Sequence, residues 1–166
     1  MTLLATAFFL AQTPAVCPVA WTGISSQVAE AQTLLVETEQ DWFNLWLKHT
    51  GQDASKWPMQ NPVPKVDFKA YNVLVIFGGK LHQTAGYTVL SLDKAGESAT
   101  FRFIPRVYGI SVGPDTPKDA FLNTPYGFFL LPKNYKRVKL EEGILESKSE
   151  PVKKFKAVGE VAAKGS

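Results

Sequence analysis

The stretch Tyr71-Asn72-Val73-Leu74-Val75-Ile76-Phe77 decides the fold, because it is an extended apolar run of residues that favour strands. It ends at Gly78-Gly79, and a second apolar segment begins after a short polar stretch and covers residues 84–90. Both segments predict β-strands. The paired glycines predict a connecting loop with a tight backbone turn or a bulge.

Other extended segments are expected on both sides of these two strands. Residues 99–104 alternate apolar and polar side chains and end at Pro105, and residues 125–132 form an apolar segment with proline at both borders. Residues 19–24 and 33–37 are shorter extended segments, and Gly96 marks a turn before residue 99. No helical crossover is expected between residues 71 and 131, so these strands should pair antiparallel.

One helix is expected before the strands, with Thr38 as its N-cap, Asp41 three positions later and Gly51 at its end. Its large side chains recur at helical spacing and share one face: Trp42, Leu45, Trp46 and His49. The predicted fold is therefore mainly β (α+β), a small antiparallel β-sandwich or partly open barrel with one N-terminal amphipathic helix packed on it.

The composition fits one compact domain with two dissimilar ends. The chain has 166 residues, of which 45% are hydrophobic and 20% are charged, as in an ordinary globular protein. A net charge of +3 is too small to indicate nucleic acid as a partner. We expect one β-rich domain over residues 19–140. We expect residues 141–166 to be a flexible lysine-rich tail, because their scattered apolar side chains do not offset the entropy of ordering.

Residues 1–18 have the character of a secretion signal, since an apolar run from Leu3 to Ala11 is followed by small residues. The run is too short for a membrane span, which takes about 20 apolar residues. We therefore expect an exported protein, in the periplasm, at the cell surface or secreted. A buried or disordered N-terminus is the alternative, because no basic residue precedes the run. Cys17 is the single cysteine, so an intramolecular disulfide is excluded.

The sequence contains no arrangement that is typical of a catalytic, cofactor or metal site. Neither His49 nor His82 has a second His or Cys at ligand spacing, so we expect neither a metal nor a cofactor. Gly78-Gly79-Lys80 lacks the spacing of a phosphate-binding loop and precedes a strand instead of a helix. We expect no catalytic residues. A hydrolase built on His82 with Asp67 is the alternative.

Several short motifs carry a family resemblance through their order and spacing. They are Trp42-x-x-x-Trp46-x-x-His49, Val66-Asp67-Phe68, the run from Val73 to Gly79, Thr84-Ala85-Gly86-Tyr87 and Thr124-Pro125-Tyr126. Together they resemble the PrcB C-terminal domain family over residues 19–135. A common form of the family has two glycines before the tyrosine, where this chain has Ala85 and Gly86. The resemblance implies an exported, non-catalytic domain, in the founding case a partner that stabilises a secreted protease.

The leading hypothesis is a non-catalytic exported binding or scaffold domain that contacts a protein partner, such as a secreted or surface protease complex. Loops held on a rigid sheet are the usual place for recognition. The candidate partner-binding residues lie between the two central strands: Gly79, Lys80, His82, Thr84, Gly86 and Tyr87. A second candidate loop covers residues 108–123. The alternative is a protease inhibitor that inserts the segment from Leu81 to Tyr87 into an active site, because Thr84–Tyr87 distantly resembles the T-G-Y loop of chagasin-type inhibitors.

Overall fold

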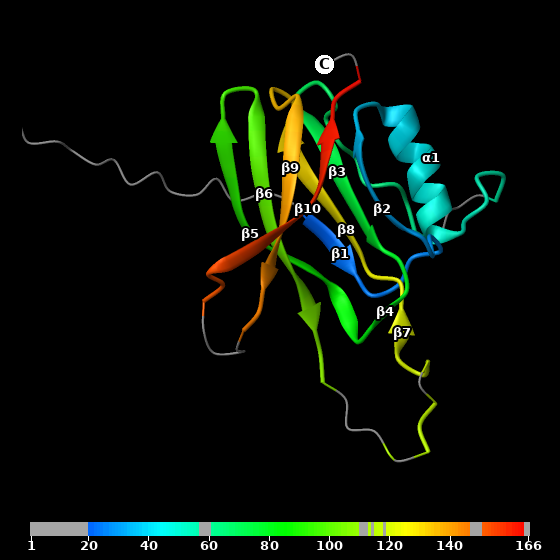
Figure 1. Cartoon of the computed structure of the whole chain (residues 1–166). Coiled ribbons are helices and arrows are strands. Elements are labelled where there is room, and N and C mark those ends of the chain that lie inside the picture. Colours follow the sequence, from blue (N-terminus) through cyan, green and yellow to red (C-terminus); the bar gives the residue numbers. More distant parts are fainter. Residues whose placement is uncertain are drawn as a thin grey trace, which may run out of the picture.

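The computed structural model describes residues 20–56, 61–109, 113, 115–117, 119–146 and 151–164. This part of the chain forms two four-stranded sheets, a two-stranded sheet and one helix (Figure 1). The fold is mainly β, without a closed barrel among the described strands, as expected for a β-sandwich with one helix. The expected signal segment, residues 1–18, lies outside the described residues.

The first sheet has the strand order β1-β8-β3-β2, and every neighbouring pair is antiparallel. Its strands are β1 (Ala20–Gly23), β8 (Tyr126–Pro132), β3 (Tyr71–Gly78) and β2 (Ala31–Val36). The central strands β3 and β8 are buried on both faces. This position explains why both read as continuous apolar runs instead of alternating with polar residues.

The second sheet has the order β10-β9-β6-β5, and the parallel pair in it is β6 with β9. Its strands are β10 (Lys154–Ala162), β9 (Arg137–Ile144), β6 (Ser98–Val107) and β5 (Thr84–Ala95). β5 and β6 form the predicted hairpin. The short strands β4 (Leu81–His82) and β7 (Leu122–Asn123) pair with each other at one end of the molecule (Figure 1).

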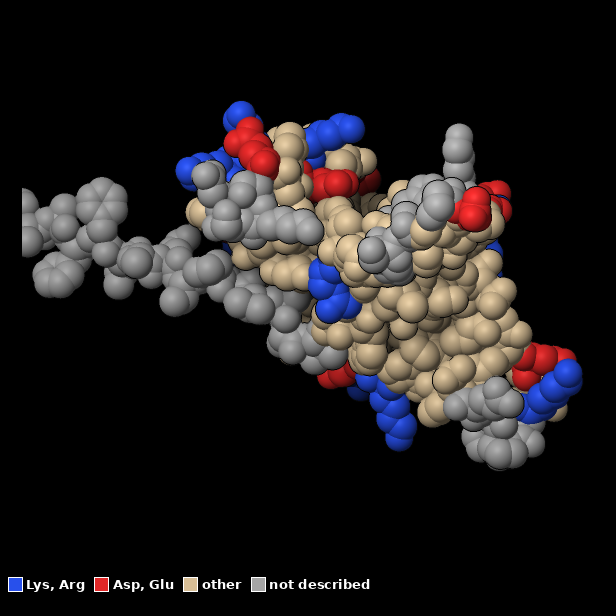
Figure 2. Space-filling model, turned by 90° about the horizontal axis from the view of Figure 1, so that it is seen from below, with Lys and Arg blue, Asp and Glu red and all other residues tan. Residues whose placement is uncertain are grey.

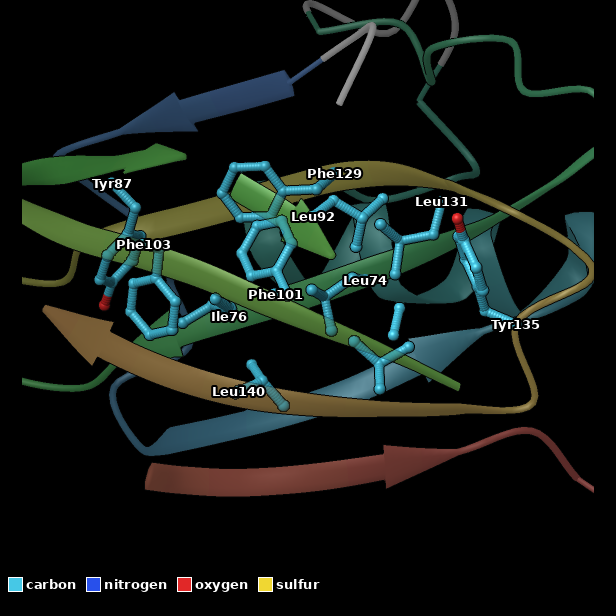
Figure 3. Close-up of a cluster of buried hydrophobic side chains, with 12 residues drawn as sticks. Leu74, Ile76, Tyr87, Leu92, Phe101, Phe103, Phe129, Leu131, Tyr135 and Leu140 are labelled. Atoms are coloured by element: carbon cyan, nitrogen blue, oxygen red, sulfur yellow. The ribbon is translucent and has the colours of Figure 1, made fainter. Parts of the chain in front are cut away.

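Two hydrophobic clusters lie on opposite faces of the first sheet. Because side chains alternate along a strand, β3 directs Leu74 and Ile76 between the sheets and Val73 and Val75 toward the helix. Figure 3 shows the cluster between the sheets, which includes Leu74, Ile76, Tyr87, Leu92, Phe101, Phe103, Phe129, Leu131 and Leu140. The molecule therefore has three layers, one of helix and two of sheet.

Helix α1 (Glu39–Thr50) forms where the sequence predicts it. The Thr38 side chain accepts a hydrogen bond of 3.1 Å from the Asp41 backbone N–H, and Gly51 ends the helix in the left-handed conformation with φ of 68°. Its buried face packs on Phe128 of β8, and the Trp42 side chain is 1% exposed. The predicted amphipathic helix is confirmed, and it covers the outer face of the first sheet.

The two central apolar segments are confirmed as strands, but they belong to different sheets. β3 pairs with β2 and β8, whereas β5 pairs with β6. The chain between them crosses from one sheet to the other and forms β4 on the way. The glycine-bearing connection is therefore a crossover between layers.

The prediction of a flexible tail from residue 141 is wrong for most of the described residues there. β9 continues to Ile144, and β10 pairs with it along Lys154–Ala162. Backbone hydrogen bonds to β9 order β10, although the low hydrophobicity of this segment predicted flexibility. Two side chains add to it: Phe155 lies 4.8 Å under the Arg102 guanidinium, and Val161 packs against the core between the sheets.

Candidate functional site

The predicted binding loop is mostly part of the structural core. Thr84 and Tyr87 are 4% and 6% exposed, so neither side chain is presented to a partner as a loop tip. Gly86 has φ of 95°, and an added Cβ would meet the Thr22 hydroxyl and lie 3.0 Å from the Gly23 backbone N. Gly79 has φ of 70° and packs in the same way against the backbone of β2.

The remaining two predicted residues are Lys80 and His82. Lys80 is exposed, and the backbone of His82 belongs to β4, where it pairs with Leu122. Burial could not be predicted from the local sequence, because it results from the crossing of the chain between the two sheets. The predicted loop therefore has mainly a structural role at this end of the molecule.

On one side of the sandwich, the Thr22 hydroxyl forms hydrogen bonds to both sheets. The Thr22 hydroxyl of β1 donates to the Tyr126 carbonyl at 2.9 Å and accepts from the Tyr87 backbone N–H of β5 at 2.8 Å. Because Gly86 has no side chain, β1 can approach β5 closely enough for this contact. The first and second sheets are joined at this edge.

The opposite side, between the edge strands β2 and β10, is closed at one end only. There the Lys164 backbone N–H donates to the Glu37 carboxylate at 2.6 Å, and the Lys164 ammonium lies 3.2 Å from the Asp41 carboxylate. Away from this end the strands enclose a cavity of about 560 Å³, which we call the open cleft. Its walls are residues 31–33 of β2 and 158–160 of β10, and its lining also includes Gly78, Leu81, Tyr87, Phe103, Pro105 and Glu142.

The open cleft is lined by both apolar and polar side chains, and its polar groups include the Tyr87 phenol and the Glu142 carboxylate. Phe103 is 3% exposed and packs edge-on against the Tyr87 ring, whose centroid lies 5.5 Å away (Figure 3). Burial, with a smaller contribution from the negative Glu142, raises the pKa of Tyr87 to about 12. The phenol is therefore a neutral hydrogen-bond donor at physiological pH, and Glu142 is close enough to influence it.

Exposed apolar side chains lie at the mouth of the open cleft. Leu81 is 36% exposed and Val158 is 44% exposed. Figure 2 shows the molecule from this end, where the surface is largely uncharged with scattered charged side chains. An apolar centre with polar groups around it is the usual anatomy of a protein-binding surface.

A second polar arrangement lies beneath the C-terminal end of α1, where the Ser26 hydroxyl is 2.9 Å from His49 Nδ1. The same hydroxyl accepts a hydrogen bond of 3.0 Å from the Val28 backbone N–H, and the Gln27 backbone N–H donates to the His49 carbonyl at 2.9 Å. Burial lowers the pKa of His49 to about 4, so its imidazole is neutral near pH 7.

The environment of His49 indicates a structural role for the Ser26–His49 pair. The ring centroids of Tyr126 and Phe128 lie 4.2 and 4.9 Å from that of the imidazole. The described side chains that contact the ring are aromatic or hydroxyl-bearing, and none is a carboxylate that could orient and charge it. The pair fastens residues 26–28 to the helix.

The histidine–aspartate pair of the hydrolase alternative does not assemble. Asp67 precedes β3, where its side chain accepts from the Lys69 backbone N–H at 3.0 Å and its carbonyl accepts from the Tyr71 N–H at 2.9 Å. His82 follows the far end of β3. An eight-residue strand separates the two residues by roughly 25 Å. Asp67 caps a local turn.

Within the described ranges, no group of three or more His, Cys, Asp and Glu side chains is placed to hold a metal ion. No helix in the same ranges combines the length and apolar character needed to cross a membrane.

The open cleft was missed by the sequence prediction. The contribution of β2 has a local signal, because Ala31–Val36 carries no charge although it lies at the edge of a sheet. The contribution of Glu142 has none, since its position depends on the pairing of β9 between β6 and β10. Comparison of the chain with models of known protein families, with curated proteins and with solved structures finds no match.

Proposed function

We propose that this chain is a non-catalytic binding or scaffold domain that contacts a protein partner through the open cleft. The observation that carries the proposal is the asymmetry of the sandwich. One edge is joined by the Thr22 hydroxyl, and the other leaves a cavity of about 560 Å³ with apolar side chains at its mouth. A cavity of this size holds several side chains of a partner.

The chemistry at the open cleft suits recognition. The exposed apolar side chains Leu81 and Val158 offer contact area to a partner, and the Tyr87 phenol and the Glu142 carboxylate offer directional polar contacts. The Ser26–His49 pair is occupied in fastening residues 26–28 to α1. Binding, without bond-making, is therefore the role that we assign to the domain.

We further propose that the domain is exported and that its partner belongs to a secreted or surface protease complex. Two sequence features support this: the signal-like residues 1–18 and the resemblance of residues 19–135 to the PrcB C-terminal domain family. Both are independent of the open cleft. Export and partner class can therefore be tested separately from the position of the binding surface.

The protease-inhibitor alternative requires the segment from Leu81 to Tyr87 to enter an active-site cleft. Tyr87 lies in the core between the sheets, and Gly86 is packed against β1. Extending this segment into a protease would break the contact that joins the two sheets. The structure therefore favours the open cleft over the inserted loop.

Site-specific photo-crosslinking in the native host tests the proposal. A photoreactive amino acid replaces Val158 at the mouth of the open cleft, and in a matched variant it replaces the exposed Lys94 near the β5–β6 turn. We expect one host protein to be crosslinked through position 158 and absent from the position 94 variant. Crosslinking of no protein, or of the same proteins through both positions, would contradict the proposal.

A further inference from the structure

We propose that the open cleft accepts an extended segment of the partner protein, which pairs with the free edge of β2 and places a lysine or arginine side chain beside Glu142. This inference rests on the proposed function and specifies the chemistry of the partner. It has two separable parts, backbone pairing on β2 and charge recognition at Glu142.

The first part rests on the character of β2 as an edge strand. β2 has one strand neighbour among the described residues, and its sequence Ala-Gln-Thr-Leu-Leu-Val contains neither a charged residue nor a proline. Its register with β3 runs without a bulge from Ala31 to Val36. A regular, uncharged edge of this kind is a template for another strand.

The opposite wall of the open cleft is protected against such pairing. β10 carries Lys154 and Lys156, and a register shift between Ala157 and Gly159 interrupts its ladder with β9. Edge lysines and bulges are common means of preventing strand addition. The contrast between the two edges selects β2 as the strand that accepts a partner.

The free length of β2 is limited at one end. Beyond Val36, the Glu37 side chain is held by Lys164, which occupies the space beside that end of the strand. The available edge is therefore residues 31–33, the part of β2 that lines the open cleft. Three or four residues of an incoming strand span about 10 Å. This length of edge can therefore pair with one central residue of the partner and the residues next to it.

The second part rests on charge complementarity. The residues that line the open cleft include Glu142 and Glu160 and no lysine or arginine. Glu142 forms no ion pair within the described part of the chain, although Lys156 lies opposite it in the β9–β10 register. A basic side chain can lay its alkyl stem along Leu81 and Phe103 and bring its charged end to this carboxylate.

Synthetic peptides test both parts with the whole folded protein. The probe is a fluorescent heptapeptide of alternating valine and threonine with lysine at its centre. A second peptide has glutamate at the central position. A third peptide has the lysine sequence with N-methylated backbone amides. Fluorescence anisotropy gives the affinities. We expect the lysine peptide to bind at least roughly tenfold more tightly than the glutamate peptide, and the N-methylated peptide to lose most of its binding.

Two variants locate the charge recognition. Glu142→Gln is expected to bring the lysine-to-glutamate affinity ratio close to one. Glu97→Gln removes the same charge at the β5–β6 turn and should leave the ratio unchanged. On binding, amide NMR signals of residues 31–33 are expected to shift, and those near Lys94 are not.

Several results would overturn the inference: no binding of any peptide, equal binding of the lysine and glutamate peptides, or undiminished binding of the N-methylated peptide. Dimerisation of the free protein, with the same shifts at residues 31–33, would assign the β2 edge to a second copy of the chain and would also overturn it. If crosslinking through position 158 captures a partner while every peptide fails, the proposed function stands and this inference alone is rejected.

Discussion

Acidification from neutral pH is expected to destabilise the fold through His49, before most carboxylates are protonated. The imidazole is 5% exposed and surrounded by aromatic rings, so the folded protein holds it in the neutral form. In the unfolded chain the ordinary pKa of 6.5 applies, whereas burial lowers the pKa to about 4 in the fold. The unfolded state therefore binds a proton first as the pH falls.

The sign and size of the effect follow from this difference. The contribution of neutral His49 is complete above pH 6.5, decreases as the pH falls toward 4 and is absent below that value. The difference between the two pKa values corresponds to about 3 kcal/mol of unfolding free energy. Such a loss is a large fraction of the total stability of a small domain.

Urea unfolding followed by tryptophan fluorescence measures this loss, because the Trp46 ring packs against His49 and Trp42 packs against Trp46. The matched control is His49→Gln, whose amide can still hydrogen-bond to Ser26 but does not titrate. Between about pH 7 and about pH 4.5, we expect the wild type to lose roughly 2.5 kcal/mol more than the variant. Carboxylates titrate in both proteins and cancel in this difference.

Equal pH dependence of the wild type and the His49→Gln variant would refute the reasoning. An independent measurement covers the case in which the variant does not fold. NMR titration of the His49 ring protons in the wild type gives the pKa directly. A value near 6.5 would show that the imidazole is not held neutral by the fold.

Three other predictions concern the stability effects of substitutions in the two sheets. Gly86→Ala should lower the unfolding free energy by roughly 3 kcal/mol, because its φ is 95° and the new Cβ would meet Thr22. Gly96→Ala should cost about 1 kcal/mol, because Gly96 has φ of 62° but open space around it. Equal losses in urea unfolding would contradict this. Thr22→Val should cost about 2 kcal/mol in the same assay, since it removes the hydrogen bond from Tyr87 that joins the sheets and the bond to Tyr126 within the first sheet. An unchanged midpoint would argue against the closed edge. Asn72→Val should raise the unfolding free energy by about 1 kcal/mol, because the buried Asn72 amide oxygen has no hydrogen-bond partner among the described residues. A lower thermal midpoint would show that the amide is stabilising.

The sequence predicted the elements whose causes are local. The Thr38 cap, the Gly51 stop and the spacing of the tryptophans all lie within one helix, so the helix could be placed closely. The strands at residues 71–78 and 98–107 were likewise indicated by apolar runs and turn residues. Local patterns predict these elements because helix and strand formation there depends on residues within a few positions of one another.

Features that depend on contacts between distant segments could not be predicted. Tyr87 was predicted as a partner-binding residue at the start of a strand, but its side chain is buried because the chain crosses between sheets immediately before β5. β10 was expected to be flexible, but it is ordered by hydrogen bonds to β9 that its own composition does not reveal. The open cleft depends on both errors, since Tyr87 lies inside it and β10 forms one wall.

The two walls of the open cleft differ in how firmly they are held, and this decides how the cleft can adapt to a partner. β2 is paired along its full length with the buried strand β3, so moving it would disturb both hydrophobic clusters. β10 is the outer strand of its sheet, and its far end is held to the helix side by the exposed Lys164. Exposed ion pairs contribute little to stability. We therefore expect the opening to be adjusted by movement of β10, while β2 remains a fixed edge on which an incoming strand can register.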